Sequence, residues 1–227
     1  CAKGLPIGII DTAIDDAHPA LHDRKIKQSE IRPPGAHEAA PIWHGTGIAS
    51  VLAGNADSST PGLIPGADIY ATNIFFADKA GNAISDSAAL LGALDLMDRF
   101  GVKIINMSVS GGRDELVERM VQKLADKGVI IVSAAGNGGP DAPPSYPAAY
   151  PQVVAVTAVN RDKLGYSHAN RGNYIDIAAP GVNIWTALPG VQEGYQTGTS
   201  FAVPYATAVI AAIYRQSPLK TKDALLG

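Results

Sequence analysis

Five short apolar runs alternate with helix-like segments along the chain. The predicted strands are Leu5–Asp11, Ile69–Phe75, Val102–Met107, Val129–Ala134 and Val153–Val159. The predicted helices are Gly45–Ala53, Asp86–Phe100, Asp114–Lys127 and Ser200–Gln216. This alternation predicts an α/β fold in which a mainly parallel sheet carries helices on both faces, joined by right-handed crossovers. Ligands of such sheets bind beyond the carboxyl ends of the strands, so functional residues are expected at that edge.

The composition favours a folded, globular chain. Apolar residues make up 46% of the 227 residues and charged residues only 17%, which suits a large core and argues against disorder. No internal repeat and no long linker divides the sequence, so we expect one domain over residues 1–227. The formal charge is only −3 and the Lys and Arg residues are scattered, so we expect no nucleic-acid partner.

Cysteine content and apolar run length exclude further classes of protein. The single Cys1 excludes an internal disulfide and a cysteine-based zinc site. No apolar run reaches the roughly 18 residues needed to cross a bilayer, so no membrane span is expected. No basic and apolar leader precedes Leu5, and we expect a mature, soluble chain from which a leader could already have been removed.

Asp11 and His44 are candidate members of a proton-transfer site. Asp11 ends the first apolar strand, which places its carboxylate at the carboxyl tip of that strand, although aspartate is also common in ordinary turns. His44 stands in a Trp-His-Gly-Thr-Gly segment at the start of a predicted helix. An imidazole there can take and return a proton near neutral pH, but a lone histidine is also often a plain surface or core residue.

Ser200 and Asn137 are candidates for the chemistry of acyl transfer. Ser200 precedes an apolar stretch of small residues, and backbone N–H groups at a helix start attract developing negative charge. A serine in that place is also an ordinary helix N-cap. Asn137 follows a strand in an Ala-Ala-Gly-Asn-Gly segment, where its amide could donate to an oxyanion, but Asn before Gly is also a turn signal.

The order and the surroundings of these four residues resemble one family, the subtilases, over nearly the whole chain. The matching segments are IIDTAID, HPAL, HGTGIASVLAG, INMSVSGG, VIIVSAAGNGG, SYPA, VVAVTAV, IAAPGVNI and GTSFAVP. The chain order Asp, His, Ser is the one known for subtilisin and differs from that of chymotrypsin. The resemblance implies a three-layer subtilisin-like α/β fold with a mainly parallel sheet and helices on both faces.

The resemblance also implies a role for each candidate. Ser200 would be the nucleophile, His44 the general base and then acid, and Asp11 the group that orients and stabilises the imidazolium. The Asn137 side chain and the Ser200 backbone N–H would bind the oxyanion. Such a protein is a serine endopeptidase that cleaves a protein or peptide substrate through an acyl-enzyme, and it requires no cofactor.

Substrate contacts are implied by the same resemblance. The residues expected to pair with an extended substrate as an added strand are Ser108, Val109, Ser110 and Gly111. The opposite wall of the primary pocket would consist of Ala134, Ala135 and Gly136, with Ser145 and Ala148 near the floor. Small residues on both walls predict room for a medium-sized or large apolar side chain.

Several positions near the candidate site differ from the residues usual in the family's sequence motifs. Ala13 stands where the family usually has the glycine of Asp-Thr-Gly. Gly47 and Tyr205 each replace a frequent histidine, and Phe201 follows the serine where many subtilases have methionine. None of these positions belongs to the expected triad, but the departures near the site favour the alternative of a scaffold or a specialised module.

One further difference from the family, at Ala20, bears on whether the protein binds calcium. Ala20 lacks the carboxylate that similar proteins use for a tight calcium site, and calcium needs six to eight oxygen ligands. We therefore expect no tightly bound metal at that position. Asp15, Asp16 and Asp78 remain as ligands for a weak structural calcium ion, or as ordinary solvated turn carboxylates.

Two other functions compete with a general endopeptidase. The first is a scaffold, or a specialised maturation-protease module of a larger protein, with little general proteolytic activity. The second, a nucleotide-binding α/β domain, is disfavoured because no Gly-rich phosphate fingerprint opens a helix after the first strand. The family resemblance further implies a secreted or periplasmic monomer from which an N-terminal propeptide has been removed.

Overall fold

A computed structural model describes residues 2–216 and 221–227. Cys1, on which the expectation about disulfides and zinc rests, lies outside the described residues. The helices are α1 (Trp43–Ala53), α2 (Ser87–Phe100), α3 (Glu115–Asp126), α4 (Thr199–Gln216) and α5 (Lys222–Leu226). The strands of the main sheet are β1 (Pro6–Asp11), β2 (Ile26–Glu30), β4 (Asp68–Asn73), β7 (Ile104–Met107), β8 (Ile130–Ala134), β9 (Val153–Val159) and β10 (Ile177–Pro180). The remaining strands are β3 (Glu38–Ala39), β5 (Phe76–Ala77), β6 (Ala83–Ile84), β11 (Ile184–Leu188) and β12 (Gln192–Gln196).

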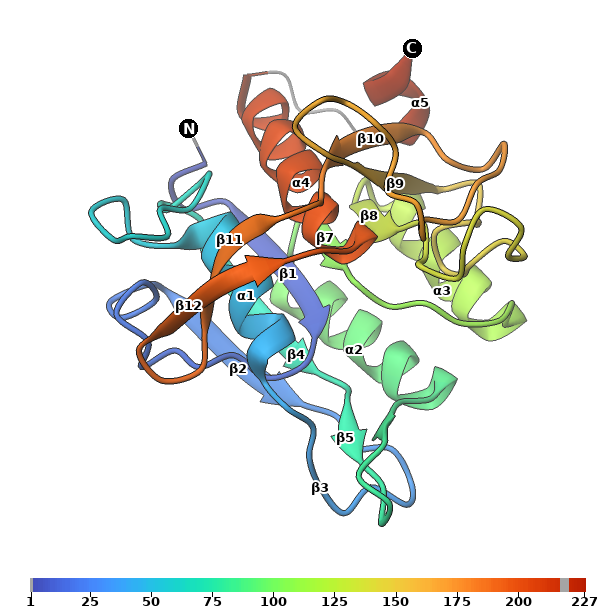
Figure 1. Cartoon of the computed structure of the whole chain (residues 1–227). Helices are drawn as coiled ribbons and strands as arrows, with labels where there is room; N and C mark the ends of the chain where they lie inside the picture. Colours follow the sequence, from blue (N-terminus) through green and yellow to red (C-terminus); the bar gives the residue numbers. More distant parts are fainter. Residues whose placement is uncertain (1, 217–220) are drawn as a thin grey trace.

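The main sheet has seven strands in the order β10-β9-β8-β7-β1-β4-β2, and every neighbouring pair is parallel. Helices α1 and α4 pack on one face, and α2 and α3 pack on the other (Figure 1). The predicted α/β class, with helices on both faces of a parallel sheet, is therefore confirmed. Because β1 lies near the middle of the sheet, its carboxyl end opens onto the edge where ligands of such folds bind.

The alternation of side chains along the strands divides the core in two. In β1, Ile7 and Ile9 point toward α1 and α4, whereas Ile10 points toward α2 and α3. The same division separates Ile104 from Ile105 in β7. Successive strand residues face opposite sides of a sheet, so a strand buried on both faces is apolar at nearly every position. This is why the central strands appear in the sequence as continuous apolar runs.

The helix starts differ from the predicted ones by one or two residues, for identifiable reasons. Asp86 and Asp114 are extended N-cap residues whose carboxylates accept hydrogen bonds from the first helical turn, so they precede α2 and α3 rather than belong to them. Ser200 is the second residue of α4, so it is not the N-cap of that helix. The predicted start of α1 at Gly45 is two residues late, because the helix begins at Trp43.

Four predicted strands are too long at one end, the first of them by Leu5 alone, because apolar residues also close helices and turns. The N–H of Val102 donates to Met97 at the end of α2, and the N–H of Val129 donates to Leu124 at the end of α3. Both residues are buried without being part of a strand. Phe75 lies beyond β4, where its N–H donates to the Asn73 side chain at 3.0 Å.

The sequence pattern did not predict the outer strands. β2 lies at one edge of the sheet and reads IKQSE, with no continuous apolar run. The antiparallel hairpin β11–β12 was also missed, although it packs on α1 and its second strand leads directly into α4. Such strands are stabilised by pairing and contacts with remote segments, which a local pattern does not reveal.

Helix α5 is fixed to the sheet by a largely buried ion pair. Lys222 Nζ lies 2.7 Å from Asp176 Oδ2 and donates to the Val153 carbonyl at 2.8 Å, and both charged side chains are about 15% exposed. Asp176 Oδ2 also accepts from the Ala155 N–H at 2.8 Å. A short helix of this kind has little stability of its own, so this contact carries much of its attachment to β9.

We predict that Lys222→Met lowers the free energy of unfolding by about 2 kcal/mol, because it leaves the Asp176 carboxylate poorly solvated and without its counter-charge. The matched control is Lys25→Met, whose partner Asp68 lies at 3.4 Å in a pair that is 78% and 30% exposed. That exposed pair should contribute at most about 0.5 kcal/mol. Urea denaturation measures both values, and equal losses in the two variants would contradict this account.

Candidate active site

Asp11 lies at the carboxyl end of β1 and is almost fully buried, with 1% of its surface exposed. Its Oδ1 accepts the N–H of Thr12 at 2.7 Å. Its Oδ2 is buried and has no hydrogen-bond partner among the described residues. A carboxylate in this setting is weakly screened by solvent, so its charge acts strongly on any group that touches it.

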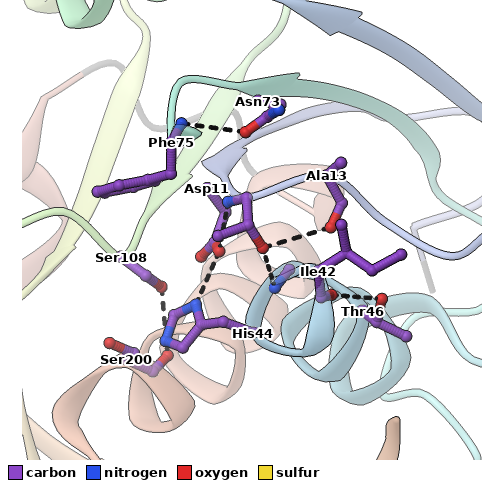
Figure 2. A network of polar contacts seen from close by, with 11 residues as sticks. Asp11, Ala13, Ile42, His44, Thr46, Asn73, Phe75, Ser108 and Ser200 are labelled. Atoms are coloured by element: carbon purple, nitrogen blue, oxygen red, sulfur yellow. Dashed lines mark hydrogen bonds and ion pairs between the residues drawn. The ribbon is translucent and has the colours of Figure 1, made fainter. Parts of the chain in front are cut away.

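The start of α1 brings His44 against this carboxylate. Gly45 permits the approach, because a Cβ at that position would lie 2.4 Å from the Thr12 carbonyl oxygen. The N–H of Gly45 then donates to Thr12 Oγ1 at 2.8 Å. The result is a contact of 2.7 Å between His44 Nδ1 and Asp11 Oδ1, shown in Figure 2. The structure thus brings together Asp11 and His44 as predicted.

Two opposing effects set the pKa of His44. Burial of the ring lowers it, whereas the charge of Asp11 and the hydrogen bond to Asp11 raise it. The net result is a pKa of His44 above its ordinary value of 6.5. The hydrogen bond to the carboxylate also fixes the proton on Nδ1 in the neutral ring, which leaves Nε2 as the nitrogen able to accept a proton.

Ser200 lies beside the His44 ring, on the side away from Asp11 (Figure 2). The next residue, Phe201, supports this placement, because its ring centroid is 5.3 Å from that of His44. The structure contains no hydrogen bond between Ser200 Oγ and His44 among the described residues. Contacts between a nucleophile and its base are often long without substrate and tighten when substrate binds.

Asn137 is held so that its amide nitrogen is free to donate. Its Oδ1 accepts hydrogen bonds from both the N–H and the hydroxyl of Thr199, each at 3.0 Å. Because a backbone N–H can only donate, this contact settles which end of the amide is oxygen. The Nδ2 group makes no hydrogen bond to another described residue, and Asn137 is exposed. Thr199 immediately precedes Ser200, so the free donor lies beside the predicted nucleophile.

The predicted substrate segment Ser108–Gly111 continues from the end of β7. No backbone hydrogen bond joins Ser108, Val109 or Ser110 to another described residue, whereas Gly111 pairs with Tyr146 through bonds of 2.8 and 3.0 Å. The segment therefore offers free N–H and C=O groups along most of its length, as an added strand requires. Its contact with substrate remains a prediction.

The predicted opposite wall of the primary pocket, Ala134–Gly136, begins at the last residue of β8 and continues beyond it. Ala134 and Ala135 are buried, and Gly136 has a φ of +106°, which favours glycine. At the predicted floor, Ser145 is buried and its hydroxyl lies 2.6 Å from that of Ser110, while Ala148 is also buried. The predicted floor therefore carries the Ser145 hydroxyl, paired with that of Ser110, beside the small apolar side chain of Ala148.

A cleft of about 470 Å³ lies next to the free segment. Val109, Ser110, Gly111 and Gly112 form part of its lining, together with the start of α2 and the residues around Tyr146. Its apolar side chains include Phe75, Ile84, Leu90, Val117 and Tyr150. A peptide lying along Ser108–Gly111 could place an apolar side chain in this cleft.

Two departures from the family text are spatially coupled. A Cβ at Gly47 would lie 3.1 Å from the Phe201 ring and 3.2 Å from Thr186 Oγ1. The absence of a side chain at Gly47 thus leaves the space in which Phe201 packs against His44. The large residue at one position and the small residue at the other are therefore explained by a single packing arrangement.

Potential metal ligands do not gather near these residues. Within the described ranges, no group of three or more His, Cys, Asp or Glu side chains is arranged to hold a metal ion. Asp15 instead accepts the N–H of Gly190 at 2.7 Å, and Asp78 accepts the N–H groups of Ala80 and Asn82. The weak calcium ion considered for Asp15, Asp16 and Asp78 stays a prediction.

Two residues that sequence reasoning missed shape the site. Thr199 orients Asn137, and its place inside the GTSFAVP segment was a signal that could have pointed to it. Asn170 supports the adjacent loop, because its Oδ1 accepts the Gly138 N–H at 2.8 Å and its Nδ2 donates to the Pro143 carbonyl at 3.1 Å. Nothing in the sequence separates Asn170 from other loop asparagines.

Comparison with known proteins gives one consistent result. The sequence profile described as "Subtilase family" matches residues 2–225. Subtilisin E of Bacillus subtilis (strain 168) is 30% identical over 227 residues, covering 96% of this chain but 58% of the relative. Subtilisin BL of Lederbergia lenta is 31% identical over 218 residues, covering 95% of this chain and 78% of the relative. The chain thus spans little more than half the length of the first of these.

Solved structures give the same fold. The protease domain of PatA, solved as a mutant, aligns with a TM-score of 0.85 at 28% identity, covering 97% of this chain and 85% of that one. The prenylagaramide maturation protease PagA aligns with a TM-score of 0.82 at 26% identity, covering 97% of this chain and 79% of that one.

The helices of the described residues do not combine the length and the apolar character that a membrane span requires.

We predict that the pKa of His44, followed by NMR of its imidazole, lies above 6.5 and falls in Asp11→Asn, because the ring stays buried while the carboxylate charge is lost. A raised folded-state pKa means that this pair contributes its full stability below pH 6.5 and loses it as pH rises through the folded pKa. Neutral His44, the form able to act as a base, accumulates over the same rise.

The control for this titration is Asp23→Asn, since Asp23 contacts a different histidine, His22, at 3.0 Å. That substitution should leave the His44 titration unchanged. A His44 pKa at or below 6.5, or one that Asp11→Asn does not lower, would show that the contact of 2.7 Å does not control the ring.

Proposed function

Because the chain belongs to the subtilase family, we propose that it is a serine endopeptidase with Asp11, His44 and Ser200 as its triad and Asn137 as an oxyanion donor. The observation that carries the proposal is the contact of 2.7 Å between His44 and the buried Asp11, with Ser200 on the other side of the ring. When a carboxylate, an imidazole and a serine hydroxyl lie side by side in that order in space, the imidazole can take the hydroxyl proton and the serine becomes nucleophilic.

The proposed acylation step gives each of these groups a role. Ser200 Oγ attacks the scissile carbonyl carbon while its proton passes to His44 Nε2. Asp11 stabilises the imidazolium that results. The carbonyl electrons move to the oxygen, which the Nδ2 group of Asn137 and the backbone N–H of Ser200 stabilise. His44 then gives its proton to the leaving nitrogen, the C–N bond breaks, and the acyl-enzyme and an amine product remain.

Deacylation repeats these roles with water in place of the serine hydroxyl. Water gives a proton to His44 and attacks the ester carbon of the acyl-enzyme. The second oxyanion collapses, the bond to Ser200 Oγ breaks, and the proton returns to that oxygen. The free carboxylic acid product leaves, and the enzyme is restored without a cofactor.

Substrate binding is proposed to use the free backbone of Ser108–Gly111 as a strand that pairs with the peptide, with Ala134–Gly136 as the opposite wall of the primary pocket. Main-chain hydrogen bonds of this kind accept many sequences, so selectivity would come from side-chain pockets. Ser145 and Ala148 are proposed at the floor of the primary pocket. The cleft of about 470 Å³ would receive a second side chain of the same peptide.

The wider setting is proposed from the family. Residues 1–227 would form the catalytic domain, a monomer that acts on protein or peptide substrates outside the cytoplasm, as a secreted or periplasmic protein. An N-terminal propeptide would be removed before the enzyme acts. No cofactor is required, and a weak calcium ion near Asp15, Asp16 or Asp78 would serve structure alone.

A specialised maturation protease is the second candidate function. The observation in its favour is the structural similarity to the protease domain of PatA and to the prenylagaramide maturation protease PagA, at TM-scores of 0.85 and 0.82. An enzyme of that kind would use the same triad on a narrow set of peptides. The two candidates therefore differ in substrate range rather than in chemistry.

We expect a fluorophosphonate probe to label the chain at Ser200 and to leave Ser200→Ala unlabelled, because labelling demands an activated hydroxyl. A randomised peptide library, incubated with the wild type and with Ser200→Ala as the dead control, should then be cut by the wild type alone. Sequencing of the products gives the residue preferred before each cut.

The outcomes separate the candidates. Labelling with broad cleavage supports a general endopeptidase, whereas labelling with cleavage of very few peptides supports the maturation protease. Absence of labelling in a folded wild-type protein would contradict both candidates.

A further inference from the structure

A proline inside α4 deprives the nucleophile residue of a helical hydrogen bond. In an α-helix the carbonyl of residue i accepts from the N–H of residue i+4, and for Ser200 that residue is Pro204. Proline has no backbone N–H, and its ring also pushes against the carbonyl four residues earlier. The Ser200 carbonyl therefore lacks its regular partner at the very point where the position of Ser200 matters for reaction.

A side chain that immediately follows a distant strand lies where it can act as a replacement donor. The hydroxyl of Ser108 is directed at the Ser200 carbonyl oxygen at 3.5 Å, which is longer than the roughly 2.5–3.0 Å usual for an O–H···O hydrogen bond, so the contact is a weak one (Figure 2). Ser108 immediately follows β7, and α4 packs against that strand. The contact therefore links two segments that lie 92 residues apart in the sequence.

The same short stretch of α4 is held on its other sides as well. Thr199 is bound to Asn137 through its N–H and its hydroxyl, and the Phe201 ring packs against His44. The flanking residues are thus fixed to the oxyanion loop and to the base. Ser108 supplies the contact to Ser200 itself, from the segment that we propose binds substrate.

From this arrangement we propose that Ser108 is a positioning residue for the nucleophile, whose hydroxyl replaces the helical hydrogen bond that Pro204 removes from the Ser200 carbonyl. The inference rests on the proposed function for its catalytic consequence, but the contact itself is a property of the fold. The Ser108 hydroxyl holds Ser200 Oγ in line between His44 and the substrate carbonyl. Its loss should slow the chemical step and leave binding through the Ser108 backbone unchanged.

The test is a double-mutant cycle of Ser108→Ala and Pro204→Ala on the full chain. In the wild-type background, Ser108→Ala should lower kcat about fivefold, a loss of about 1 kcal/mol in transition-state stabilisation, with KM within about twofold of the wild type. In the Pro204→Ala background the Ser200 carbonyl regains an N–H donor. There, Ser108→Ala should change kcat by less than about twofold.

A matched pair of substitutions at one position separates the hydroxyl from the packing. Ser108→Thr keeps the hydroxyl, whereas Ser108→Val introduces nearly the same shape as threonine without it. We expect the Ser108→Thr variant to retain at least about half of the wild-type kcat, and the Ser108→Val variant to lose about as much as Ser108→Ala. This pair also serves if the Ser108→Ala variant fails to fold.

Thermal unfolding of the four proteins in the cycle gives a readout that needs no activity. Ser108→Ala should lower Tm in the wild-type background and have a smaller effect in the Pro204→Ala background. If the cycle shows this coupling in Tm but the wild type cleaves no peptide, the proposed function is overturned while the positioning contact is supported. Equal losses in both backgrounds, in kcat and in Tm, would overturn the positioning role, as would a loss confined to KM.

Discussion

The hydrogen-bonded pair of Asp11 and His44 is the contact on which the rest of the site depends. A nearly inaccessible carboxylate at the end of β1 meets an imidazole at the start of α1 at 2.7 Å. The pair fixes the tautomer of the ring, raises its pKa and aims the opposite nitrogen at α4. This contact requires Gly45, because any side chain there would collide with the Thr12 carbonyl and move the helix away.

The sheet supplies rigidity, and the loops beyond it supply chemistry. The strands β1, β7 and β8 are neighbours, so Asp11, the Ser108 segment and the Asn137 loop emerge at one edge although they are far apart in the sequence. The start of α4 is then held against His44 by Phe201, against the Ser108 segment by Ser200 and against the Asn137 loop by Thr199. A nucleophile fixed from several directions loses little freedom on reaching its reactive position, which is the physical advantage of preorganisation.

The sequence allowed the central architecture to be predicted, because buried parallel strands are continuous apolar runs. The four main candidates were weak signals one by one, since Asp11, His44, Asn137 and Ser200 each have an ordinary local explanation. They were predicted together because their order and surroundings resemble one family. The features that were missed depend on remote partners. The hairpin β11–β12 packs on α1. The fit of the Phe201 ring into the space left by Gly47 becomes visible only when α1 and α4 are packed together. The role of Thr199 likewise requires the Asn137 loop to be in position.

The most direct test of the central claim is the pre-steady-state release of product from an activated ester substrate in excess, followed by stopped-flow. An aligned nucleophile predicts a rapid burst of one product molecule per active site, followed by slower turnover as the acyl-enzyme is hydrolysed. In Asn137→Ala the burst should slow by about 100-fold to 1,000-fold, and in Ser200→Ala it should vanish. Product release that is linear from the start, at the same rate in the wild type and in Ser200→Ala, would contradict the account.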